Sequence, residues 1–474
     1  MRWLAPAALT VVLATWLPTL RFGFVNWDDD IHVYRNPAVV APHPTASERL
    51  LTPGLGYPIP VTVASYRLEH RLFGLWPSPY HASNVLLHLL SCLAIFLLGR
   101  RLGLAVPGAT AALLLFGLHP VVAEPVSWVS GRKDLLAAAL ALWATVAFCR
   151  GLDAPRPGRW WTAATTLFAG AALAKPAVLA LPLFWVVLGR HRERPWRAAV
   201  LPALPAALVA AAVGALAVLG QSRVGALSAP MGALSWLRQV WYAFGYHLGL
   251  AEVVRPPQAK HIPPAMPPPF RATVDLLPFL LLAAAAALTL RLPPARRRIA
   301  GLGWSWAALA YLPSANLLPL ARFVADSYVY LPLAGVAWAA GAAVDGRRLR
   351  TWSGSTVAAA ATATLIMLAL VSSARWRDGV ALWGSVWADY PDSPQVCRDL
   401  GNAYNEAGRA AQALGHYQEC ARRFGPGMFE KNIAVTLTVL GRREEATALF
   451  RRLAAERPDD PVVRRYLGQL TRPP

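Results

Sequence analysis

Apolar blocks separated by short polar loops fill the first 374 residues of the chain. Many of these blocks approach 20 residues, about the length at which a helix crosses the hydrocarbon core of a bilayer. The pattern predicts an all-α, polytopic membrane protein with about eleven transmembrane helices. The expected spans are residues 3–20, 81–99, 104–120, 134–149, 160–174, 176–189, 198–219, 273–290, 299–319, 328–344 and 355–373.

The charges in the loops predict the topology. The chain is 56% hydrophobic and 15% charged, yet its formal net charge is +21. In a soluble domain this excess would suggest a nucleic-acid partner, but much of it lies in five short loops that hold 16 Arg and two acidic residues. Short basic loops mark the cytoplasmic side of a membrane, so we expect a cytoplasmic N-terminus and no nucleic acid. The five loops are residues 100–101, 150–159, 190–197, 291–298 and 347–350.

Two apolar blocks allow a second interpretation. Residues 235–253 are long enough to cross but contain Arg238 and Glu252, and counting them as a span would place loop 291–298 outside. We therefore predict an interfacial or re-entrant helix in an outer loop, 220–272, which ends in the stiff "RPPQAKHIPPAMPPPF". The N-terminal block is either a signal peptide or an uncleaved anchor, and the lack of a small-residue cleavage pattern favours the anchor. Eleven spans then place the C-terminus outside.

From Arg375 the sequence changes to amphipathic helices with an internal repeat. The spacing follows the tetratricopeptide-repeat pattern, in which helix pairs stack and present a groove. A second copy follows 33 residues after the first, and residues 381–394 are similar to the second helix of an earlier, degenerate unit. We expect a binding or assembly module without chemistry of its own. The pattern residues of the first copy are Leu400, Gly401, Tyr404, Gly408, Ala413, Tyr417, Cys420 and Pro426.

The four cysteines are too few for a disulfide framework. Cys92 and Cys149 fall in predicted spans, where we expect them only to pack. Cys397 and Cys420 fall on the two helices of one repeat, at positions that commonly face each other, and an extracytoplasmic compartment permits a bond. The sequence leaves open whether these two residues pair.

Polar residues gather at the predicted outer ends of the spans. The first outer loop, residues 21–80, carries three consecutive acids at 28–30, whereas cations lie near 132, 175 and 322. A carboxylate can accept a proton from an acceptor hydroxyl while Arg and Lys neutralise a departing phosphate. The alternative is that the acids cap a helix start and the cations extend to lipid headgroups. The pattern alone predicts only a polar site on the outer face.

Five pieces of sequence occur in order along the membrane part and precede the repeats. They are "FVNWDDDIHVYRNPAV", "YPIPVTVASYRLEHRLFGLWPSPYHASNVLLHLL", "LFGLHPVVAEPVSWVSGRKD", "AKPAVLALP" and "ADSYVYLPLAG". Together they resemble bacterial relatives of the transmembrane and tetratricopeptide-repeat O-mannosyltransferases, of the C-type glycosyltransferase superfamily. The resemblance implies an enzyme of the bacterial inner (cytoplasmic) membrane that uses a polyprenyl-phosphate-linked sugar, inverts the anomeric carbon and carries an acidic base on the first outer loop. In the eukaryotic relatives the donor is dolichyl-phosphate mannose and the acceptor is a protein hydroxyl.

The resemblance also implies roles for individual residues. The paired acids of the family's first loop fall on Asp28 and Asp29, because Asn36 and Pro37 follow at the expected distance. Asp29 is the first candidate for the base, and Asp30 is a spare. The remaining expected site residues are Arg132, Lys133, Lys175 and Arg322 at the donor phosphate, and His119, Glu124 and Asp326 lining the site.

The chain departs from the family pattern in "ADSYVYLP", where relatives usually have an arginine and this chain has Ser327. If that arginine binds phosphate, a cation is missing here. Arg322 would substitute for it if the segment is helical, because a long side chain about one turn earlier reaches the same place. Otherwise this copy has weakened or lost activity.

We expect no obligatory metal. The acidic run offers oxygen ligands of the kind that magnesium or manganese prefers. A lipid-monophosphate donor has a single phosphate, however, and the nearby cations can neutralise its charge without an ion.

The sequence therefore predicts a glycosyltransferase-like membrane domain, residues 1–374, and a tail, residues 375–474, that holds a protein or glycan acceptor, or a partner, near the site. Two other classes of protein stay open. One is a catalytically inactive, membrane-anchored repeat scaffold. The other is a transporter, which fits less well because the charges lie at the outer rim and not at mid-bilayer. The expected outer loops of the membrane domain are residues 21–80, 119–133, 220–272 and 320–327.

Overall fold

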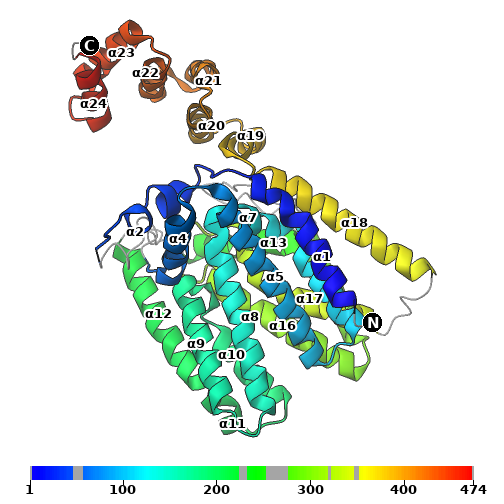
Figure 1. Cartoon of the computed structure of the whole chain (residues 1–474). Coiled ribbons are helices and arrows are strands. Elements are labelled where there is room, and N and C mark those ends of the chain that lie inside the picture. Colours follow the sequence, from blue (N-terminus) through cyan, green and yellow to red (C-terminus); the bar gives the residue numbers. More distant parts are fainter. Residues whose placement is uncertain are drawn as a thin grey trace. The chain divides into compact units, whose positions relative to one another are not determined.

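The computed structural model describes residues 3–45, 57–223, 232–251, 276–318, 322–345 and 352–471. The chain divides into two compact units (Figure 1). The membrane unit comprises Met1–Phe24 and Asp28–Ala374, and the repeat unit comprises Val25–Trp27 and Arg375–Pro474. The regular structure of the described residues is entirely helical, as the sequence predicts.

Each of the eleven predicted spans overlaps a helical segment of the membrane unit, although the boundaries differ by several residues in places. Leu4–Trp16 (α1) continues into a 3₁₀ turn, and the block at 235–253 forms a separate helix, Ala233–Ala251 (α13). Most of the proline-rich segment that follows this block lies outside the described residues. The other principal helices are α4 (Pro60–Phe73), α5 (Pro77–Leu102), α6 (Val106–Leu118), α7 (Ala123–Ser127), α8 (Arg132–Asp153), α9 (Gly158–Ala174), α10 (Leu181–His191), α11 (Trp196–Val200), α12 (Leu204–Arg223), α15 (Leu277–Leu290), α16 (Pro294–Tyr311), α17 (Tyr330–Val344) and α18 (Trp352–Ala374).

The described helices support fewer full spans than eleven. Six are long and apolar enough to cross a membrane, and a seventh arises if α6 and the segment Pro120–Ser127, bent by 49°, form one broken span. Pro176–His191 and Leu277–Leu290 are apolar but shorter. Apolar blocks read from the sequence run through loops and 3₁₀ turns as well as helices, so one block is not always one long helix, and the count of eleven spans stays a prediction.

The centre of the membrane unit is built on close helix contacts. Helix α8 packs against α5 and α9, and α17 packs against α6 and α16. Small residues allow the closest of these approaches: a side chain at Gly303 would place its Cβ 2.5 Å from the backbone oxygen of Gly335. Small residues at helix interfaces are characteristic of membrane bundles, where lipid tails provide no hydrophobic drive for association.

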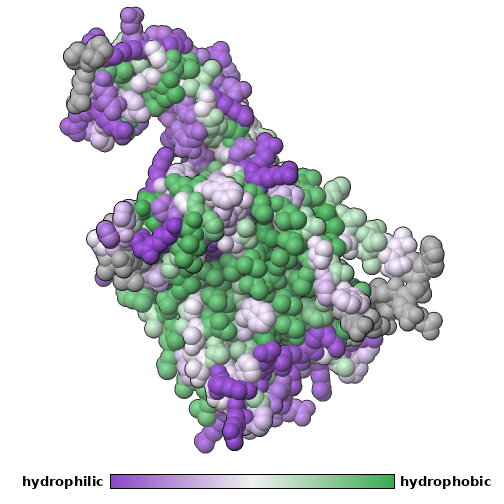
Figure 2. Space-filling view, viewed as in Figure 1, coloured by the Kyte–Doolittle hydropathy of each residue, from purple (hydrophilic) through white to green (hydrophobic). Residues whose placement is uncertain are grey.

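The periphery of the membrane unit is apolar and exposed. Leu208 and Leu216 of α12 are 64% and 54% exposed. Figure 2 shows hydrophobic residues across the visible face of the bundle, with hydrophilic residues gathered at the end where Figure 1 labels α11. A surface of this kind is stable only against lipid, so the chain is a polytopic membrane protein.

The repeat unit is a series of short helices with polar caps. Neighbouring helices pack in sequence order, and the side chains of Asp378, Ser393 and Asp460 accept hydrogen bonds from the first turns of α19, α20 and α24. This arrangement agrees with stacked helix pairs, and the tetratricopeptide assignment stays a prediction. The helices are α19 (Gly379–Asp389), α20 (Pro394–Glu406), α21 (Ala410–Phe424), α22 (Glu430–Val439), α23 (Arg443–Glu456) and α24 (Pro461–Leu470).

The structure pairs Cys397 of α20 with Cys420 of α21 in a disulfide, with 6.1 Å between their Cα atoms. The question that the sequence left open is thereby answered. Cys92 and Cys149 are free thiols buried in the membrane unit.

Candidate active site

The acidic run forms a sharp turn. Asp28 adopts a left-handed backbone conformation with φ +64°, which among non-glycine residues is found mainly at Asn and Asp. A single π-helical turn, η2 (Asp30–Tyr34), follows, and the His32 N–H donates to the Asp28 carbonyl at 2.8 Å. Strained residues and π-helical turns both cluster at functional sites. The turn places the three carboxylates in different surroundings.

Asp29 is an anchor within the membrane unit. It is fully buried, and its Oδ1 accepts hydrogen bonds from the Ser130 N–H at 2.9 Å and the Ser130 hydroxyl at 2.6 Å. Asp30 is partly exposed and lies 3.6 Å from the Arg35 guanidinium. Asp29 therefore fastens the first outer loop to the turn before α8, whereas Asp30 makes a surface ion pair.

Asp28 is the acid that faces the cations. It is partly exposed, and its charge interacts with those of Lys133 and Arg322. The Lys133 Nζ donates to the Ser130 carbonyl at 3.0 Å and lies 4.3 Å from the centre of the Trp128 ring. Asp28 and the two cations are thus close enough for their charges to interact, and Asp28 is partly exposed.

His32 is buried against this cluster, with 3% of its surface exposed. Burial lowers its pKa to about 3, and the positive charge of Lys133 adds to that shift while Asp28 opposes it. The imidazole is therefore neutral at physiological pH.

The buried His32 predicts acid sensitivity. The unfolded chain binds a proton below the ordinary histidine pKa of about 6.5, whereas the folded chain does not until about pH 3. The free energy of unfolding should therefore fall as pH decreases below 6.5, by up to about 2 kcal/mol at pH 5. Thermal unfolding in detergent measured from pH 7 to 5 should show a shallower decline for His32→Gln than for wild type. The exposed His43, replaced in the same way, should leave the slope unchanged; equal slopes in all three proteins would contradict the assignment.

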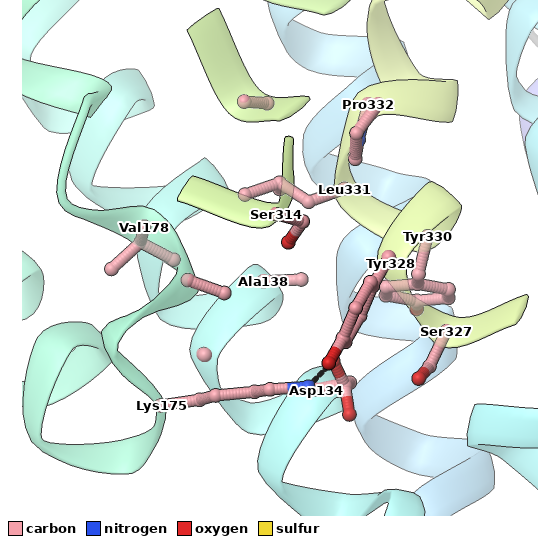
Figure 3. A pocket seen from close by; sticks show the side chains of 13 residues that line it. Asp134, Ala138, Lys175, Val178, Ser314, Ser327, Tyr328, Tyr330, Leu331 and Pro332 are labelled. Carbon is pink, nitrogen blue, oxygen red and sulfur yellow. Dashed lines mark hydrogen bonds and ion pairs between the residues drawn. The ribbon is translucent and has the colours of Figure 1, made fainter. Parts of the chain in front are cut away.

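A second charged pair lies deeper in the unit. The Lys175 Nζ is 2.5 Å from Asp134 Oδ1, and both residues are buried. Figure 3 shows the Lys175 side chain extended toward Asp134, with Tyr328 alongside, and Lys175 lies 5.4 Å from the centre of that ring. The cavity that they line with Ser327 has a volume of about 20 Å³, enough for about one water molecule. A sugar phosphate does not enter this space without movement of the surrounding segments.

Arg322 lies at the site although its segment is not helical. The sequence predicts that Arg322 replaces the missing arginine only if this segment forms a helix, but residues 322–325 have no regular structure before the 3₁₀ turn η8 (Asp326–Val329). Arg322 nevertheless lies 3.9 Å from the buried Glu124 carboxylate. Ser327, at the position where relatives usually have arginine, hydrogen-bonds the Glu124 side chain. Glu124 thus links the segment after α16 to α7.

The geometry does not support Arg132 as a phosphate ligand. The residue is 1% exposed, and its guanidinium donates to Asn84 Oδ1 at 2.5 Å, Glu69 Oε1 at 3.0 Å and the Tyr80 carbonyl at 2.7 Å. It also lies 5.1 Å from the centre of the Tyr66 ring. These partners come from α4 and α5, so Arg132 joins the first outer loop to the bundle.

The two remaining predicted residues also have internal partners. His119 is buried, and its Nδ1 accepts a hydrogen bond from the Val121 N–H at 3.3 Å. Asp326 Oδ1 accepts from the Tyr246 hydroxyl of α13 at 2.8 Å. Helix α13 is thereby connected to η8 beside the site.

Several residues of the site were not predicted from the sequence. They include Ser130, His32, Asp134 and Tyr328. Ser130 and Asp134 lie within the quoted "SWVSGRKD", and a serine two residues before a basic pair was the available signal. His32 and Tyr328 have no such signal, because His32 matters through its burial and Tyr328 through the contact of its ring with Lys175.

Comparison with curated proteins finds matches to one kind of enzyme, although no family model matches the chain. The chain is 34% identical over 154 residues to protein O-mannosyl-transferase Tmtc1 of Drosophila melanogaster, covering 30% of this chain and 18% of that protein. It is 35% identical over 109 residues to human protein O-mannosyl-transferase TMTC3, covering 23% of this chain and 12% of that protein. Over these stretches the chain is similar to protein O-mannosyl-transferases. The family resemblance seen in the sequence is thereby confirmed.

The chain spans less than one fifth of the length of each of these two proteins. Two solved structures are also similar. ArnT from Cupriavidus metallidurans bound to undecaprenyl phosphate has a TM-score of 0.44 and 17% identity, covering 98% of this chain and 84% of that one. Archaeal oligosaccharyltransferase AglB from Archaeoglobus fulgidus, in complex with an inhibitory peptide and a dolichol-phosphate, has a TM-score of 0.48 and 13% identity, covering 86% of this chain and 60% of that one.

Proposed function

We propose that the chain is a membrane glycosyltransferase that moves a sugar, mannose or a similar hexose, from a polyprenyl-phosphate donor to an acceptor hydroxyl with inversion. The observation that carries the proposal is the partly exposed Asp28, whose charge interacts with those of Lys133 and Arg322. An acid that can accept a proton beside cations that can neutralise a phosphate is the combination that this reaction requires. The sequence similarity to O-mannosyl-transferases supports the same chemistry.

In the proposed reaction, Asp28 accepts the proton of the acceptor hydroxyl as its oxygen attacks the anomeric carbon. The bond between that carbon and the phosphate oxygen breaks, and the lipid phosphate leaves with the bonding electrons. Lys133 and Arg322 stabilise the charge that develops on the leaving phosphate. The geometry favours Asp28 over Asp29 as the base. The Asp29 carboxylate is buried and accepts two hydrogen bonds from Ser130, whereas Asp28 is partly exposed.

The other residues have supporting roles in this proposal. Lys175, already paired with Asp134, is a reserve cation near the phosphate, and Glu124 holds Arg322. The acceptor is proposed to be a protein hydroxyl, as the names of the relatives suggest, with the repeat unit holding the acceptor. The proposed location is a bacterial inner membrane, with the N-terminus cytoplasmic and the repeats outside.

The donor class can be tested in membranes that contain the full chain. Labelled mannose is supplied as polyprenyl-phosphate mannose, other lipid-phosphate sugars serve as a panel, and GDP-mannose is the nucleotide-sugar control. We expect transfer from a lipid-phosphate sugar, equally with and without EDTA because no metal is required. Transfer from the nucleotide sugar alone, or from no donor at all, would refute the proposed function.

A further inference from the structure

A three-residue piece of the first outer loop belongs to the repeat unit. Val25–Trp27 is part of that unit, while Phe24 before it and Asp28 after it belong to the membrane unit. The chain therefore enters and leaves the repeat unit immediately before the proposed base. This is in addition to the connection between Ala374 and Arg375.

The tripeptide is held by helix α19. The Trp383 Nε1–H donates to Asn26 Oδ1 at 2.8 Å, and the Trp27 and Trp383 rings meet edge to face with 5.7 Å between their centres. A side chain at Gly379 would place its Cβ 2.9 Å from Asn26 Oδ1, so the missing side chain of that glycine makes space for the amide. Val25 is 1% exposed. These contacts are specific, because one hydrogen bond and one ring pair converge on a single tryptophan.

Both neighbours of Asp28 are thus fixed by side chains far away in the sequence. Trp27 is held by Trp383, and Asp29 is held by Ser130. Asp28, with φ +64°, sits at a sharp change of chain direction between these two fixed neighbours, so its carboxylate position depends on both. Release of either neighbour allows the backbone to relax and moves the carboxylate.

We propose that Trp383, acting through Asn26 and Trp27 and the peptide bond that joins Trp27 to Asp28, is a positioning residue for Asp28. This inference rests on the proposed function for its kinetic consequence. Misplacement of a reacting group by about 1 Å is enough to cost two orders of magnitude in rate. Loss of the Trp383 contact should therefore reduce turnover without changing the affinity for the donor.

The test uses the full chain with Trp383→Phe and, as a milder variant, Asn26→Ala. The matched control is Trp387→Phe on the same helix, whose ring contacts His416 and Phe424 within the repeat unit. We expect kcat to fall roughly tenfold or more in Trp383→Phe and in Asn26→Ala, with KM for the lipid-phosphate donor unchanged. The kcat of the double variant should be no lower than that of either single variant, because the two substitutions remove the same hydrogen bond between Trp383 and Asn26. Trp387→Phe should keep the wild-type kcat.

A second readout does not depend on activity. Amide hydrogen exchange of the segment 28–34, which includes the His32 N–H bonded to the Asp28 carbonyl, should accelerate in Trp383→Phe and Asn26→Ala but not in Trp387→Phe. Unchanged exchange and unchanged kcat, with Asp28→Asn inactive, would overturn the positioning role and leave the proposed function intact. Equal losses in Trp387→Phe would also overturn it, because they would indicate general destabilisation of α19. If wild type transfers no sugar but exchange accelerates as expected, the proposed function fails while the structural inference holds.

Discussion

Replacing Asp28 with asparagine is expected to reduce sugar transfer by at least roughly a hundredfold, because general-base catalysis contributes about that much or more. Asparagine keeps the size of the side chain and tolerates the left-handed backbone that Asp28 adopts. The protein should therefore fold and insert as wild type does. Initial rates with a lipid-phosphate sugar at matched protein levels measure the effect.

Asp30→Asn is the matched control. It makes the same chemical change two residues away and removes only the ion pair with Arg35, whose side chain is 66% exposed. Exposed pairs of this kind contribute roughly 0–1 kcal/mol, so transfer should stay near the wild-type rate. Full activity of Asp28→Asn together with loss of activity in Asp29→Asn at normal stability would return Asp29, the first candidate from the sequence, to the role of base.

Replacing Arg132 with methionine is expected to destabilise the membrane unit by roughly 3–5 kcal/mol, because it leaves the Glu69 carboxylate buried without its partner. The same change leaves Asn84 Oδ1 without the Arg132 donor. Thermal unfolding in detergent measures the loss. The double variant Arg132→Met with Glu69→Gln should recover part of it, since the buried charge is then gone.

The two roles considered for Arg132 give opposite results in this experiment. If the residue holds the first outer loop to the bundle, stability falls first and any loss of transfer follows from unfolding. Wild-type stability with abolished transfer would instead support the phosphate contact that the family resemblance suggested.

Much of the membrane fold could be predicted from the sequence, because a chain segment surrounded by lipid must be apolar and helical. Every predicted span contains helical structure, since a backbone in hydrocarbon must satisfy its own hydrogen bonds. The number of complete spans stays a prediction, because length and hydropathy do not show where an apolar stretch bends, as between Val106–Leu118 and Pro120–Ser127, which meet at 49°.

The site was predicted in part. The acidic run and Lys133 were found from their place in the sequence, but the different surroundings of Asp28 and Asp29 depend on one serine, Ser130, and on a left-handed turn. Residue types alone predict neither the hydrogen bonds of Ser130 nor the left-handed turn at Asp28. Arg132 illustrates the same limit, since adjacent basic residues look alike in sequence while one is buried in a network and the other faces an acid.

The central claim is that Asp28 promotes transfer of sugar from a lipid phosphate. Its most direct test is to incubate purified full-length protein with labelled polyprenyl-phosphate mannose and a host-cell extract that contains the acceptor. The labelled product and the released polyprenyl phosphate are both quantified. We predict that the two appear in equal amounts with wild type and that both disappear with Asp28→Asn. Product formation at the wild-type rate by Asp28→Asn, or its absence with wild type while the protein is folded, would contradict the account.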